Sequence, residues 1–76
     1  MAYEIPIEAM QALGRKLANV RIKNNLHQED LITRSNGNLS MGTIIAIENA
    51  KYNVKLAQLL SYVDALGCEL TVQPKE

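Results

Sequence analysis

The residues that most often carry out chemistry in proteins are scarce in this 76-residue chain. His27 is the one histidine and Cys68 the one cysteine, so neither a zinc site nor a nucleophile–base pair has the side chains it needs. Nothing in the sequence concentrates Ser, Asp and Glu, and Gly37 and Gly42 match neither phosphate-binding spacing. We therefore expect no enzyme activity, no catalytic residue, no metal site and no cofactor. His27 is expected to be a weak helix cap or a surface residue.

The net charge of the chain limits the kinds of partner that it is expected to bind. Lys plus Arg equals Asp plus Glu, eight of each, so the formal net charge is zero, which argues against a basic coat that binds nucleic acid without sequence preference. A neutral sum still permits one basic face, and residues 15–23 contain Arg15, Lys16, Arg21 and Lys23 with no acid among them. The alternative for such a run is an ordinary solvated helix face.

Composition and cysteine usage predict one small cytoplasmic domain. A single cysteine permits no disulfide within the chain, which fits a reducing compartment. No stretch approaches the roughly 20 apolar residues of a membrane span, and the opening MAYEIPIEAM lacks the basic start and long apolar run of a signal peptide. Hydrophobic residues make up 47% of the chain, with no Trp and no Phe, so the core is expected to be aliphatic. A core of this size is marginal, and dimerisation is a common remedy.

The spacing of the apolar residues predicts four helices. In the first and the fourth of them, apolar side chains recur at spacings of three and four. Pro6 suits the start of the first helix, and Gly67 suits the end of the fourth. Ser40 suits the N-cap of the third. The β-branched residues of that segment would also fit a strand, but Ile44 and Ile47 lie three apart, which favours a helix. The expected helices span residues 7–24, 28–35, 40–48 and 54–66.

The end of the chain follows a period of two. Apolar and polar side chains alternate over residues 68–73, which predicts a half-buried strand. The members of this strand are Cys68, Glu69, Leu70, Thr71, Val72 and Gln73. A strand needs a ladder partner for its backbone groups, either residues 3–7 of the same chain or the same strand of a second subunit. We favour the second subunit, and hence a homodimer, because Pro6 weakens the first segment as a ladder member.

Two short helices joined by a turn between two longer helices make a helix-turn-helix arrangement, whose second short helix enters the major groove of DNA. The stretch LHQEDLITRSNGNLSMGTIIAIENAKYNVKLAQLLSYVDALG resembles the λ-repressor-like (XRE) helix-turn-helix family in its Gln-Glu opening, its Ser-x-x-Thr-Ile helix and its Leu-Gly end. The resemblance covers roughly residues 10–67. It implies a mainly α bundle of four helices, to which the C-terminal strand adds a link across a homodimer.

The resemblance also implies a DNA-binding surface. Gln28 matches the family's residue at the DNA backbone and groove edge. The start and exposed face of the recognition helix, and the phosphate-binding loop after it, correspond to Ser40, Met41, Gly42, Thr43, Ala46, Asn49, Lys51 and Asn53. Thr43 and Gln28 are expected to form hydrogen bonds with bases. Met41, Ile45 and Ala46 are expected to contact thymine methyl groups.

Arg21 and Glu48 match a pair that commonly bridges the first helix to the end of the recognition helix, where a paired charge fixes geometry more than it adds stability. Three features depart from the family's pattern. Ile32 stands where Ala is preferred, and the SNGN turn absorbs about two extra residues, so the angle between the short helices is expected to differ. Ala50 occupies the usual Gly position of the loop, where a positive φ would cost about 1 kcal/mol. The usual polar base readers are replaced by Met41, Gly42 and Ala46.

The end of the chain, LGCELTVQPKE, is similar to the tail of HipB-like antitoxins, in which one strand from each subunit pairs to close the dimer. Together the resemblances imply a dimeric, sequence-specific repressor, autoregulatory as in phage or toxin–antitoxin operons, that binds a palindromic operator in double-stranded DNA. They also imply a toxin or other protein partner. The alternative, supported by the neutral charge and the apolar third helix, is a protein-interaction module on the same fold that binds DNA weakly or not at all.

Overall fold

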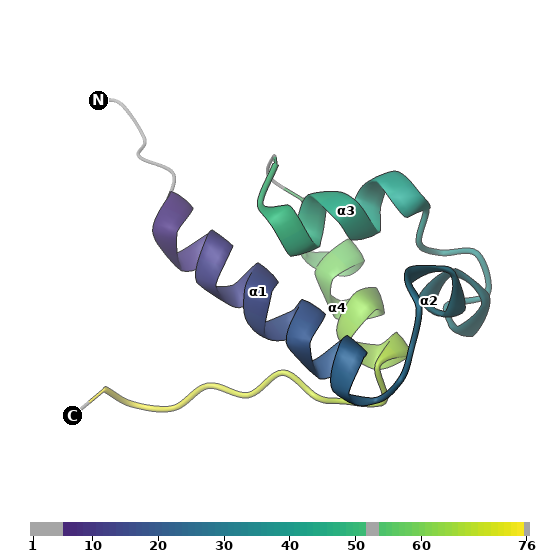
Figure 1. Cartoon of the computed structure of the whole chain (residues 1–76). Coiled ribbons are helices and arrows are strands. Elements are labelled where there is room, and N and C mark those ends of the chain that lie inside the picture. The colour runs from purple at the N-terminus through teal and green to yellow at the C-terminus, as the bar shows by residue number, and fades with distance from the viewer. Residues whose placement is uncertain (1–5, 52–53, 76) are drawn as a thin grey trace.

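The computed structural model describes residues 6–51 and 54–75 and shows a mainly α fold of four helices (Figure 1). The helices are α1 (Ile7–Lys23), α2 (Gln28–Arg34), α3 (Met41–Asn49) and α4 (Leu56–Ala65). All four expected helices are confirmed, with ends that differ from the prediction by at most two residues. The third segment is a helix and not the strand that its β-branched residues also allowed. Within the described residues, no helix combines the length and hydropathy that a membrane span requires.

Local hydrogen bonds explain where two of the helices begin. Ser40 Oγ accepts the backbone N–H of Thr43 at 3.2 Å, so Ser40 caps α3 from outside, as predicted, and the helix starts one residue later. α4 starts two residues later than expected because Gln58 Oε1 accepts the N–H of Lys55 at 2.9 Å and Lys55 becomes the cap residue. Residues 52 and 53, just before this start, lie outside the described residues.

Left-handed backbone conformations end the helices and form the turns. Asn25 (φ 58°) follows α1, Gly37 (φ 81°) lies in the turn after α2, and Gly67 (φ 76°) follows α4, where the sequence predicts a helix end. Ala50 ends α3 at φ 51° and ψ 46°. The loop position where the resembled family has glycine therefore does need a positive φ, and the side chain of Ala50 costs about 1 kcal/mol there.

The core is aliphatic and surrounds one tyrosine. α3 contacts α1, α2 and α4, and it thus lies at the centre of the packing. Its closest approach is to α1 at Gly14, where an added Cβ would lie only 2.5 Å from the carbonyl oxygen of Ile47. The largest fully buried side chains are Tyr62, Leu31, Leu39 and Ile44.

Residues 68–75 form no strand in the single chain; within residues 6–51 and 54–75 every regular element is a helix. The segment follows α4 and returns along α1 (Figure 1). A groove of about 330 Å³ separates the two and is lined by Lys16 and Leu17 on one side and by Glu69 and Leu70 on the other. A strand exists only as a member of a ladder, and no described segment of the chain pairs with this one. Most of residues 3–7, the alternative partner, lies outside the described residues. The predicted strand therefore requires a partner that residues 6–51 and 54–75 do not supply.

Candidate nucleic-acid interface

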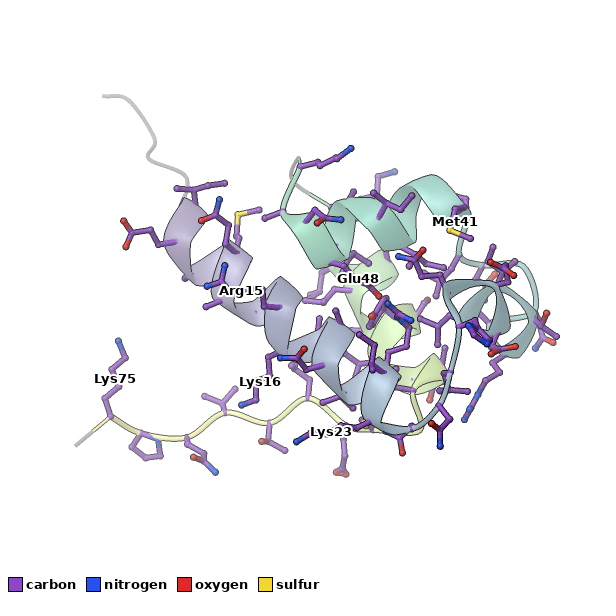
Figure 2. All side chains as sticks on the ribbon, viewed as in Figure 1. Arg15, Lys16, Lys23, Met41, Glu48 and Lys75 are labelled. Carbon is purple, nitrogen blue, oxygen red and sulfur yellow. The ribbon has the colours of Figure 1, made fainter. Side chains whose placement is uncertain are left out.

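A buried polar network centred on Glu48 ties α3 to the other helices. Arg21 of α1 donates from Nε to Glu48 Oε2 at 2.8 Å and from Nη2 to Glu48 Oε1 at 3.1 Å, which is the bidentate geometry of a strong ion pair. The hydroxyl of Tyr62 on α4 donates to Glu48 Oε2, and Gln28 Nε2 on α2 donates to Glu48 Oε1 at 3.0 Å. Figure 2 shows Glu48 between α1 and α3. The expected pair of Arg21 and Glu48 is thereby confirmed.

The Glu48 side chain lies in the interior and is only 6% exposed. The network nevertheless keeps its carboxylate ionised. Burial by itself would raise its pKa, but the hydrogen bonds from Arg21, Tyr62 and Gln28 outweigh burial and hold the pKa of Glu48 below its ordinary value. The hydrogen bond to Glu48 raises the pKa of Arg21. Burial, reinforced by the same carboxylate, raises the pKa of Tyr62. At neutral pH the ion pair therefore stays charged and the phenol stays protonated.

The face of α3 opposite the buried side chains of Ile44 and Ile47 is at least partly exposed. Gly42 and Asn49 are exposed, and Met41 and Ile45 are partly exposed, together with the cap residue Ser40. These positions follow the helical spacing of three and four and form one stripe, and Figure 2 shows Met41 at the outer end of α3. Asn49 Nδ2 donates to the carbonyl of Ile45 at 3.0 Å. The stripe is therefore apolar at its centre, with polar groups only at its two ends.

Two residues that the sequence placed on this stripe are buried instead. Thr43 is 8% exposed, and its Oγ1 accepts a hydrogen bond from Ser40 Oγ at 3.0 Å. Ala46 is 1% exposed and lines an apolar pocket of about 200 Å³ with Leu13 and Gly14 of α1. The prediction that Thr43 and Ala46 lie on the exposed face is wrong, and their burial argues against contact of either side chain with a base. The physical reason is that α3 is apolar on nearly every side, so its sequence holds no polar face that would show which side packs inward.

The remaining predicted contact residues are placed as follows. Gln28 is partly buried and gives one amide hydrogen to Glu48, which leaves the second hydrogen of that amide for another acceptor. Asn49 and Lys51 are exposed at the end of α3 and just after it. Asn53 lies outside the described residues. The contact of each of these residues with DNA stays a prediction.

Two contributors to this region were not among the predicted site residues. Tyr62 lies in the apolar stripe of α4, and a tyrosine on a buried face signals a hydroxyl that needs a partner. Arg15 was noted only as part of a basic stretch. The structure places it in a cleft of about 270 Å³ that Gln11, Glu48 and Asn49 also line. This cleft joins the exposed end of α3 to a cationic side chain of α1.

Within the part of the chain that the structure describes, no three His, Cys, Asp or Glu side chains gather where a metal ion would be held. His27 is exposed at the N-cap of α2, where its backbone N–H donates to Asp30 Oδ2 at 2.7 Å. It is thus a helix cap, as the sequence predicts.

Comparison of the chain with family models, with curated proteins and with solved structures gives no match in any of the three.

Proposed function

We propose that this chain is the subunit of a dimeric, sequence-specific DNA-binding regulator of transcription with a λ-repressor-like helix-turn-helix fold. The observation that carries the proposal is the two-sided environment of α3. Ile44 and Ile47 are buried on its inner side and Glu48 at the border of that side bonds to α1, α2 and α4. The opposite stripe of Met41, Gly42, Ile45 and Asn49 is partly or fully exposed. Insertion into the major groove requires a helix that packs against the protein on one side and is accessible on the other.

The groups beside α3 suit the DNA backbone. Arg15 and Asn49 share one cleft, and Lys51 is exposed just beyond it. In a DNA complex these side chains contact phosphates and fix the orientation of the protein, while sequence is read elsewhere. The burial of Thr43 and Ala46 removes two of the expected readers, so direct readout falls to the stripe itself and the remainder to DNA shape.

The proposed dimer is closed by residues 68–73, one strand from each subunit. Leu70 is exposed and Val72 is 95% exposed in the single chain, and both would be covered in part by a paired sheet. The ladder would also bond the backbone groups of this segment. Two subunits related by a twofold axis present two copies of α3 to half-sites about 34–36 Å apart, or a multiple of that, which corresponds to a palindromic operator.

A fluorescence titration tests the proposal. Labelled duplex from the region upstream of the gene is compared with a random duplex of equal length, at salt concentrations from about 50 mM to about 200 mM. Nanomolar binding to the upstream duplex, with a steep loss of affinity as salt rises, supports the proposal. Equal binding of both duplexes at the lowest salt would overturn it.

A second candidate function is a protein-interaction module, such as an antitoxin that neutralises a partner protein. It is favoured by the partly exposed apolar side chains of Met41 and Ile45 and by the zero net charge. Co-expression with the product of the neighbouring open reading frame tests it. Stable co-purification that Ile45→Asp abolishes, from a protein that shows no preference among DNA sequences, would favour this function over the first.

A further inference from the structure

Gly42 is the one glycine within the described residues for which the fold gives no reason. Gly14 is required by the close contact of α1 with α3, and Gly37 and Gly67 adopt positive φ. Gly42 has neither property: it does not have a positive φ, and an added Cβ would meet only Ser40 Oγ, at 3.9 Å. Glycine in a helix is less stable than alanine because it loses more conformational freedom on folding. The fold by itself would therefore favour alanine at position 42.

The surroundings of Gly42 show what the missing side chain opens. Gly42 is exposed on the outer stripe of α3, with Met41 beside it and Ile45 one turn further along, both partly exposed. Because Gly42 has no side chain, the main chain of α3 is least covered at position 42, and apolar side chains flank it. A flat partner that lies across the stripe approaches the main chain of α3 most closely there.

We propose that Gly42 is the point of closest approach between α3 and the major groove, and that the groove there presents thymine methyl groups to Met41 and Ile45. This inference rests on the proposed function and adds its sequence preference. A thymine methyl is the apolar group of the major groove, so it matches an apolar stripe that lacks a polar reader at its centre. The cleft at the end of the stripe is lined by Arg15, Asn49 and Glu48. The charge of Glu48 is paired with Arg21, so Arg15 remains to bind an adjacent phosphate, which favours DNA over an apolar protein groove as the occupant.

The proposal predicts that steric bulk at Gly42 harms binding but not folding. Gly42→Ala and Gly42→Leu fill the gap, and Ala57→Leu is the matched control because Ala57 is exposed on α4. Gly42→Ala is expected to keep the Tm or raise it by a few degrees, of the order seen when a glycine is replaced at a compatible position. Its affinity for a selected duplex is expected to fall about tenfold, and that of Gly42→Leu further. Ala57→Leu is expected to leave the affinity unchanged.

The DNA is varied in parallel. The wild-type protein first selects duplexes from a random pool, and each thymine of the selected half-site is then replaced by uracil, which removes only the methyl group. Two or more positions are expected to lose affinity by about fourfold each, the effect of one buried methyl group. These positions should lose their sensitivity to uracil in Gly42→Leu.

The outcomes separate this inference from the proposed function. If the wild-type protein selects no duplex, the proposed function fails. If it selects a duplex, yet Gly42→Leu and the uracil duplexes bind as tightly as the originals, the proposed function stands and this inference is wrong. A marked fall in Tm for Gly42→Ala would also overturn it, because the glycine would then serve the fold.

Discussion

The hydroxyl of Tyr62 and the carboxylate of Glu48 meet in the interior, where the phenol of α4 donates a hydrogen bond to an ionised side chain of α3. Tyr62 is fully buried, and Glu48 Oε2 also accepts a bond from Arg21. One carboxylate is therefore bonded from α1, α2 and α4 at once. This acceptor therefore helps to fix the orientation of α3 against the other three helices.

Tyr62→Phe tests the phenol bond. The ring and its packing remain, while the donor to Glu48 is lost, so the free energy of unfolding is expected to fall by about 1.5–3 kcal/mol, the range for a bond to a charged group. Urea unfolding followed by circular dichroism measures it. A loss below about 0.5 kcal/mol would show that Arg21 and Gln28 suffice to hold the carboxylate.

Glu48→Gln tests the charge. Folding lowers the pKa of Glu48 below its ordinary value of 4.5, so its contribution to stability is complete above that pH and is lost as the pH falls below it. The wild-type protein is expected to lose stability in this acid range. The variant, which is expected to be less stable by about 3 kcal/mol at neutral pH, should have a flatter profile there.

The matched control for this experiment is Asp64→Asn, which removes an exposed carboxylate from α4. It is expected to preserve the wild-type pH profile. Parallel profiles for the wild-type protein and Glu48→Gln would contradict the assignment of the acid transition to Glu48.

Gly14→Ala tests the spacing between α1 and α3. The new Cβ would lie 2.5 Å from the carbonyl oxygen of Ile47 and 2.7 Å from that of Glu48, and because both atoms are backbone the helices must move apart. The expected loss is about 2 kcal/mol, or about 8–16 °C in Tm. Thermal unfolding measures it, with Gly42→Ala as the contrasting case of an added methyl group in open space. Equal Tm values for the two variants would show that the contact relaxes freely.

Arg15→Ala tests the proposed phosphate contact. Loss of one such contact is expected to weaken selected and random duplexes alike and to reduce the slope of log affinity against log salt by about one. Arg34→Ala is the matched control, since Arg34 is an exposed cation of α2 whose guanidinium lies near Gly67, beyond the end of α4. Identical salt slopes for the two variants would show that Arg15 does not contact a phosphate.

Val72→Pro tests the dimer strand. Proline removes a backbone donor and is tolerated poorly inside a ladder, so the variant is expected to sediment as a folded monomer at concentrations where the wild-type protein is a dimer. Circular dichroism should show unchanged helix content, because residues 68–75 lie outside the helices. A variant that still sediments as a dimer would rule out the paired strands.

Local signals predicted the fold well. The spacing of apolar residues, the Ser40 cap and the helix end at Gly67 act within a few residues of chain, so the sequence displays them directly. The pairing of Arg21 with Glu48 spans 27 positions in the chain, and resemblance to a known family, not periodicity, indicated it.

The parts that sequence could not predict depend on orientation or on a partner. The inward side of α3 is not readable from its residues because both sides are apolar, and this is why Thr43 and Ala46 were placed on the wrong side. The bond from Tyr62 to Glu48 arises only when α3 and α4 pack together. Residues 68–73 alternate as a strand does, but pairing requires a second set of backbone groups that the described chain does not provide.

The C-terminal segment, which has no ladder partner within residues 6–51 and 54–75, would make regulation depend on the amount of protein. If, as proposed, a second copy completes the ladder, the pairing follows mass action and the fraction of paired subunits depends on how much protein the cell contains. When most subunits are still single, occupancy of a two-part operator rises with the square of their concentration, because two subunits must meet for each site. An autoregulated gene with such a product would stay active through small fluctuations and shut off sharply once the protein accumulates.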